Sequence, residues 1–121
     1  MRILLYSLIS MGVMTSAALA AQKIQSGRDL AIDACSACHQ VMPGQKPPPL
    51  VFNPDEYVDV LAPSFGTIAA KYKRRPAALR RFILNPIHPM REQDWDPADL
   101  TAVVAFIQSF GQVSSPAPLL P

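Results

Sequence analysis

The stretch Cys35-Ser36-Ala37-Cys38-His39 contains both cysteines and one of the two histidines of the 121-residue chain. Two thiols three residues apart on one helical turn can each add to a vinyl group on the same edge of a haem, and the adjacent imidazole can then reach the iron. We therefore expect one covalently attached haem c, with thioether bonds from Cys35 and Cys38 and with His39 as the proximal iron ligand.

Three other uses of the cysteine pair fit the sequence less well. A thioredoxin-type dithiol needs a preceding strand and an alternating β/α chain, which this sequence does not predict. A disulfide across so short a loop would restrict the unfolded chain little. Zinc needs two more ligands, and only His39 and His88 remain, at no standard spacing.

Residues 1–20 have the pattern of an export signal. Arg2 supplies a positive charge, residues 3–14 are mostly apolar, and Ala18-Leu19-Ala20 has the small-x-small form that signal peptidase accepts. The apolar run is too short and too interrupted for a typical transmembrane helix. We expect a periplasmic protein, with membrane association only if this segment is not cleaved.

The remaining chain predicts an all-α domain over residues 21–111 and a flexible tail rich in proline, serine and alanine over residues 112–121. No segment predicts a strand. A proline-rich loop is expected over residues 41–54, followed by one helical turn or more over residues 55–61. Ser26 and Asp96 are expected to cap the first and last helices. The periodicity of apolar residues predicts helices over about residues 26–38, 64–72, 76–84 and 97–110.

The charged residues are nearly balanced. Without Arg2, the 11 basic residues fall to 10 against 9 acidic ones, a net charge of +1. This balance, an export signal and the lack of a binding motif argue against nucleic acid as a partner. One basic run contains no acidic residue, and it indicates either a solvated surface or a docking patch for an acidic redox partner. The basic run consists of Lys71, Lys73, Arg74, Arg75, Arg80 and Arg81.

Taken in order, these features resemble class I cytochrome c, and most of all its small bacterial periplasmic members with one haem. The resemblance covers about residues 24–110 and rests on the pentapeptide and four further stretches. It implies three core helices plus one or two short helices and long loops around one haem, with the first and last helices crossing at Gly27 and Phe106. Ala31 departs from the family, which often has an aromatic residue there. The further stretches are Gly27, Ala62-Pro63-Ser64-Phe65, Ile87-His88-Pro89-Met90 and residues 100–110.

The distal iron ligand is expected to be Met90. Of the five methionines, three lie in the signal segment, and Met42 follows His39 too closely to reach the other face of a haem. Met90 stands in a turn between two predicted helices. His88 is its rival, since Pro89 adjoins Met90 directly here, whereas relatives commonly have a residue between the proline and the methionine.

The resemblance also implies residues that surround the haem. A proline carbonyl is expected to accept a hydrogen bond from His39, and Pro63 fits the family motif, with Pro49 as the competitor. Three further side chains could donate to a haem propionate or could have only structural roles. These are Tyr72, Arg91 and Trp95.

The function implied by this resemblance is one-electron transport with His/Met-ligated haem iron, in a protein that is not an enzyme by itself. Its partners would be redox proteins, either with an acidic face or as a catalytic dehydrogenase. One alternative is the cytochrome c subunit of a periplasmic dehydrogenase complex. A less favoured one is a haem sensor or peroxidase with an open iron site.

Overall fold

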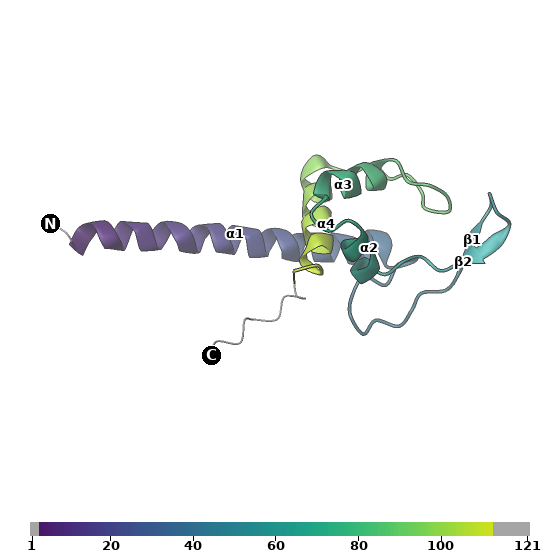
Figure 1. The fold of residues 1–121 in the computed structure, drawn as a ribbon, viewed down its shortest axis with the longest axis horizontal. Helices are drawn as coiled ribbons and strands as arrows, with labels where there is room; N and C mark the ends of the chain where they lie inside the picture. The colour runs from purple at the N-terminus through teal and green to yellow at the C-terminus, as the bar shows by residue number, and fades with distance from the viewer. Residues whose placement is uncertain (1–2, 113–121) are drawn as a thin grey trace.

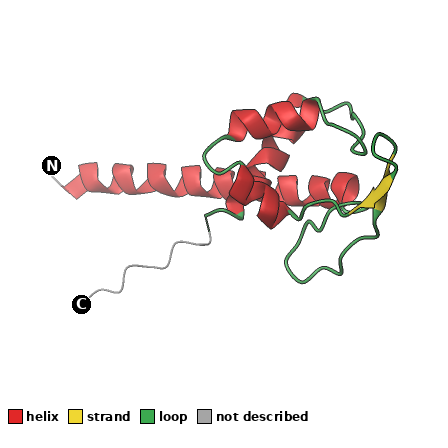
Figure 2. Ribbon diagram, turned by 45° about the vertical axis from the view of Figure 1, so that its right-hand side comes forward, coloured by secondary structure: helices red, strands yellow, loops and turns green. Residues whose placement is uncertain are grey.

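Four helices make up most of the chain in the computed structural model, which describes residues 3–112, with side chains from residue 15 onward. The three shorter helices gather at the C-terminal half of α1, and two short strands lie beyond its end (Figures 1 and 2). The predicted all-α class is confirmed. All but the first residue of the predicted tail lies outside the described residues. The elements are α1 (Ile3–Cys35), β1 (Val51–Asn53), β2 (Val58–Val60), α2 (Phe65–Lys71), α3 (Pro76–Leu84) and α4 (Pro97–Ser109).

The crossing of α1 and α4 depends on Gly27. A β carbon on this residue would lie 2.0 Å from the carbonyl oxygen of Ala102 and 3.0 Å from Cβ of Phe106. Heavy atoms cannot approach so closely, so only glycine allows the two helix backbones to touch. The predicted crossing at Gly27 and Phe106 is therefore confirmed.

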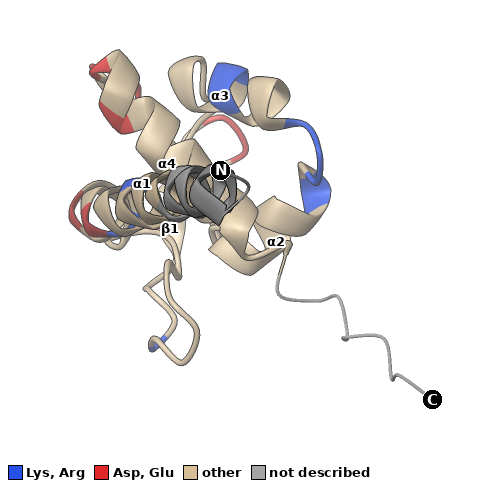
Figure 3. Ribbon diagram, turned by 90° about the vertical axis from the view of Figure 1, so that its left-hand side faces the viewer, with Lys and Arg blue, Asp and Glu red and all other residues tan. Residues whose placement is uncertain are grey.

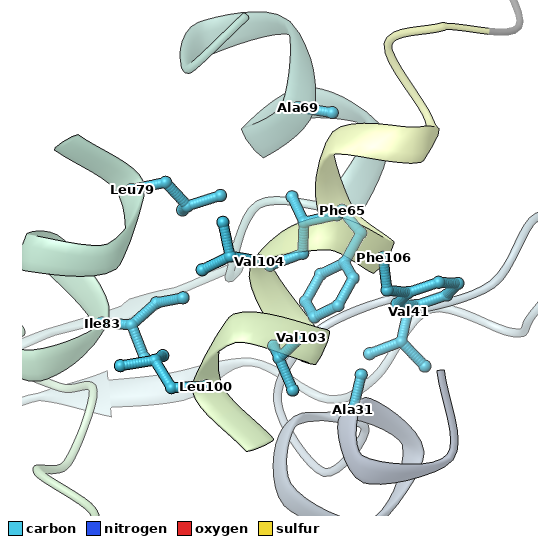
Figure 4. Close-up of a cluster of buried hydrophobic side chains, with 11 residues drawn as sticks. Ala31, Val41, Phe65, Ala69, Leu79, Ile83, Leu100, Val103, Val104 and Phe106 are labelled. Carbon is cyan, nitrogen blue, oxygen red and sulfur yellow. The ribbon is translucent and has the colours of Figure 1, made fainter. Parts of the chain in front are cut away.

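The hydrophobic core lies where the four helices meet (Figure 4). Ala31, where the family often has an aromatic residue, is completely buried, and Val41 and Phe106 lie close to it. Val41 comes from the loop after the pentapeptide, and its side chain is 1% exposed. The core consists of Ala31, Val41, Phe65, Ala69, Leu79, Ile83, Leu100, Val103, Val104, Phe106 and Ile107.

The predicted bounds of the first helix are wrong at both ends. Ser26 does not cap a helix, because α1 begins at Ile3 and continues through the alanine-rich stretch around Ala20, where helix propensity is high. The helix ends at Cys35 instead of Cys38, and a turn carries the rest of the pentapeptide. Neither α1 nor any other helix within the described part of the chain has the length and hydropathy needed to cross a membrane.

The helical turn predicted over residues 55–61, and the absence of strands, are also wrong. β1 and β2 form an antiparallel hairpin in which Val51 pairs with Val60 and Asn53 with Val58. Valine and phenylalanine favour extended backbone, and the turn residues between the strands interrupt any helix. The Asn53 side chain stabilises that turn by accepting a hydrogen bond from the backbone N–H of Asp55, at 3.0 Å.

The other predicted helix starts agree with the structure. Ser64 caps α2 by accepting from the N–H of Thr67 at 3.2 Å. Asp96 caps α4 through the N–H of Ala98 at 2.8 Å, with Pro97 in the first helical position. These capped starts fix where α2 and α4 enter the core and, with them, the positions of the connecting segments.

Candidate functional site

A cavity of about 870 Å³ opens between the C-terminal end of α1, the hairpin, and the connection between α3 and α4. In Figure 1 this connection runs above the end of α1. The cavity walls are largely apolar, and the volume is in the range of cofactor sites, about 300–1,000 Å³. Its lining includes five of the residues singled out from the sequence, namely Cys35, Cys38, His39, Pro63 and Met90.

Cys35 ends α1 and Cys38 lies in the turn that follows, with no disulfide between them. The N–H groups of Cys38 and His39 both donate to the carbonyl of Cys35, at 3.2 and 2.9 Å, and so hold the pentapeptide in a tight turn. Burial, and secondly the neighbouring Cys38, raises the pKa of the Cys35 thiol to about 11. A buried thiol with a raised pKa is a poor nucleophile, so this environment disfavours a redox-active dithiol.

A protein-ligated metal site is not formed by the side chains that the structure describes. Among them, no group of three or more His, Cys, Asp or Glu residues could hold a metal ion. Two thiols and one imidazole beside a large apolar cavity instead fit a covalently bound haem, because the ring itself supplies four of the iron's ligands.

His39 is held by Pro63. Its Nδ1 lies 2.7 Å from the carbonyl oxygen of Pro63, 24 residues further along the chain. A carbonyl oxygen can only accept, so Nδ1 carries the hydrogen and Nε2 is left with its lone pair. Pro49, the competitor, does not line the cavity. The N–H of Phe65 also donates to the carbonyl of Gln40, at 3.0 Å, and so joins the start of α2 to the residue after His39.

The two methionines whose side chains are described have different surroundings. Met90 lines the cavity, in a turn closed by a hydrogen bond from its N–H to the carbonyl of Ile87 at 3.1 Å. Met42 packs against the hydrophobic core and does not line the cavity. Met42 is therefore half-buried against the core, away from the cavity.

His88 also lines the cavity, but its imidazole is engaged elsewhere. Nδ1 lies 3.0 Å from Oδ2 of Asp55, in the hairpin turn, and the His88 side chain is 62% exposed. The His88–Pro89 peptide bond is cis. The rival ligand thus lies at the solvent edge of the cavity, whereas Met90 is half-buried.

The three side chains that could donate to a propionate or be purely structural, Tyr72, Arg91 and Trp95, all line the cavity. The Tyr72 ring lies under the cationic groups of Lys71 and Arg75, whose distances to its centroid are 5.5 and 5.6 Å. Trp95 packs against the hydrophobic core and so has a structural role too. The Arg91 side chain is exposed at the rim.

The sequence reasoning missed the hairpin as a wall of this cavity. Val51, Phe52, Val60 and Leu61 line it, although the segment was predicted as loop and helical turn. Gln93 was missed as well, and it lines the cavity while donating to the carbonyl of Ala34 at 3.4 Å. The available signal was the pair of valine-rich stretches on either side of Asn53-Pro54-Asp55, a pattern typical of a hairpin.

Comparison with known proteins gives one match. The family model described as Cytochrome c matches residues 24–111, which include the pentapeptide, the hairpin, and Met90. Searches of curated proteins and of solved structures returned no significant match.

Proposed function

This chain belongs to the cytochrome c family and so is a haem-binding protein of electron transfer, and from this premise we propose that it is a periplasmic one-electron carrier with His39 and Met90 as its axial iron ligands. The family binds haem c covalently, typically one in a domain of this size. One observation carries the proposal. A single cavity brings together Cys35, Cys38, His39 and Met90, although Met90 is distant from the others in sequence.

Each of these residues has a separate task. The iron of the bound haem supplies a reversible Fe(II)/Fe(III) couple. Cys35 and Cys38 anchor the ring as thioethers, and His39 offers Nε2 because Pro63 holds its Nδ1–H. The apolar walls exclude most water, and no side chain has to bind or transform a substrate. We infer that the chain is not an enzyme on its own.

Two observations support Met90 over His88. The His88 side chain is mostly exposed and hydrogen-bonded to Asp55, whereas the thioether of Met90 belongs to a half-buried residue that lines the cavity. Met/His ligation would raise the reduction potential relative to two histidines.

The test of the ligation is the optical spectrum of the oxidised protein purified from periplasm. Met90→Ala should abolish the weak ferric iron–sulfur band and lower the reduction potential by about 0.1 V or more, within the roughly 0.8 V that axial ligands span. The open iron should also bind carbon monoxide quickly in the reduced state.

Met42→Ala is the matched control, since it removes the other described methionine, and it should retain the band. Retention of the band in Met90→Ala would refute the assignment. Fast carbon monoxide binding by the unmodified protein would instead favour a sensor or peroxidase.

The charge distribution supports a partner with an acidic face. In Figure 3, Lys and Arg lie on α3 and on its connection to α2, and some also on α1 and a loop, while Asp and Glu lie on α1, at the start of α4 and on a loop. Two residues of the basic run serve the fold, since Arg80 donates to Thr101 at 3.0 Å and Arg75 to the carbonyl of Lys71. Lys71 lines the cavity, so this basic side lies next to the site. A dehydrogenase with an acidic docking face would fit it equally.

Ferricyanide, an anionic oxidant, can probe this surface. At low ionic strength, Lys71→Glu should slow oxidation of the reduced protein by about threefold, because field attraction raises encounter rates with anions. The difference should disappear near 1 M salt, where the Debye length is about 3 Å. Lys46→Glu changes the net charge equally, but Lys46 does not line the cavity, so this control should have a smaller effect. Equal slowing by both variants would contradict a localised docking side.

A further inference from the structure

Two segments that are distant in sequence build one wall of the haem cavity. The hairpin and the residue after it contribute the apolar side chains of Val51, Phe52, Val60 and Leu61 to this wall. The segment Ile87–Arg91 lines the cavity beside them. The methionine segment, defined here as Ile87–Met90, begins with two exposed residues. Ile87 is 71% exposed and the His88 side chain 62%. The position of this segment therefore depends on its contacts with the hairpin.

Asp55, in the turn of the hairpin, makes a polar contact with His88 of the methionine segment. Oδ2 of Asp55 lies 3.0 Å from Nδ1 of His88, and the two residues are 33 positions apart. An ionised carboxylate can only accept, so His88 donates from Nδ1. Among the side chains of residues 15–112, this is the only contact within 4 Å between a basic nitrogen and a carboxylate. Asp55 is itself fixed, because its N–H donates to the side chain of Asn53, which is 8% exposed.

The methionine segment is short and stiff, so a restraint on His88 also restrains Met90. The N–H of Met90 donates to the carbonyl of Ile87 and closes the turn around His88 and Pro89. Pro89, between the two residues in question, has a fixed φ. A side chain that holds His88 in place thus limits the positions open to the thioether of Met90.

We propose that Asp55 is a positioning residue for the distal ligand, which fastens the methionine segment to the hairpin so that Met90 stays at the iron. The proposal rests on Met90 being that ligand, as inferred above. Both partners are largely exposed, with 62% and 67% of their side chains accessible, and exposed pairs contribute little to overall stability. The effect should therefore appear as easier opening of the methionine segment, and hardly at all in unfolding of the whole protein.

The experiment uses the ferric holoprotein at constant neutral pH, with imidazole as a competing ligand. Loss of the iron–sulfur band reports the displacement of the native ligand, and its rate at saturating imidazole reports the opening of the methionine segment. Asp55→Ala should open about two- to fivefold faster and need correspondingly less imidazole for half-displacement, as expected for the loss of one exposed side-chain contact. Asp55→Asn keeps an acceptor oxygen and should show a smaller change.

Asp59→Ala is the matched control. Asp59 lies on β2 of the same hairpin, is exposed, and has no described bond to the methionine segment. Its removal should leave the opening rate unchanged. In addition, Asp55→Ala combined with His88→Ala should open no faster than the faster of the two single variants, because one contact is lost only once.

The outcomes separate the proposal from its premise. If the unmodified protein shows the band, Met90→Ala abolishes it, and Asp55→Ala behaves like Asp59→Ala, the positioning role of Asp55 is refuted while Met90 remains the ligand. If Met90→Ala keeps the band, the ligation itself is refuted, and the role of Asp55 with it. Far-ultraviolet circular dichroism should show the same helix content in all the variants, and Asp55→Asn supplies the comparison if Asp55→Ala does not fold.

Discussion

Replacement of both Cys35 and Cys38 by serine is expected to abolish covalent haem attachment completely. The two thiols lie in the same tight turn and line the same cavity, and serine cannot form a thioether. The variants Cys35→Ser and Cys38→Ser should each retain at most one thioether bond to the haem and give a lower yield of holoprotein. Intact mass after periplasmic expression measures all of this directly. The unmodified protein should have the mass of the chain from Ala21 onward plus one haem.

The same measurement tests the export proposal and has a control within the pentapeptide. Ser36→Ala removes a hydroxyl that donates only to the carbonyl of Ile32, at 2.5 Å, so its mass should still include one haem. A mass that includes residues 1–20 would show that the segment remains attached. Haem that stays on the double serine variant under denaturing conditions would contradict attachment through these cysteines.

Gly27→Val is expected to cause the largest loss of stability of any single substitution proposed here. The new β carbon would lie 2.0 Å from the carbonyl oxygen of Ala102, which belongs to the backbone of α4 and cannot rotate away. The two helices must then separate, and overpacking of this kind costs about 1–3 kcal/mol or more. Thermal unfolding of the ferric holoprotein, followed by circular dichroism, should show a midpoint lower by roughly 10 °C or more, given about 4–8 °C per kcal/mol in a domain of this size.

Gly66→Ala provides the matched glycine control. Gly66 is also helical, but the nearest atom to its added β carbon would be Oγ of Ser64, at 3.8 Å. Alanine should be neutral there or stabilise α2 by about 0.5–1 kcal/mol, since it restricts the unfolded chain. An unchanged midpoint in Gly27→Val would mean that α1 and α4 do not cross as the structure shows.

Local patterns predicted the starts of α2, α3 and α4 well. Asp96-Pro97 marks the first turn of α4 because capping involves only neighbouring residues and the fixed φ of proline. The pentapeptide is also a local pattern, because Cys35, Cys38 and His39 are close in sequence and so must be close in space. The start of the first helix was predicted wrongly because residues 1–20 were assigned to a separate signal segment. Ser26, which is inside α1, then resembled a helix cap.

The hairpin could not be predicted with equal success, because its strands are three residues each. Strands this short carry almost no periodic signal, and they are stable only through pairing and packing. The Asp55–His88 contact had no signal in the sequence at all. It joins residues from a turn and from a connection between helices, and nothing in either segment indicates the other.

The sequence alone was enough to identify the haem, the family and an all-α fold, because these follow from contiguous residues and from helical periodicity. Only the tertiary structure could bring Pro63 instead of Pro49 to His39, pack Met42 against the core, place Met90 in the cavity, and add the hairpin as a wall. The physical reason is that each of these outcomes is a contact between distant segments. Such contacts depend on how the helices pack around Gly27. They also depend on the capped starts of α2 and α4, which determine where the connecting loops run.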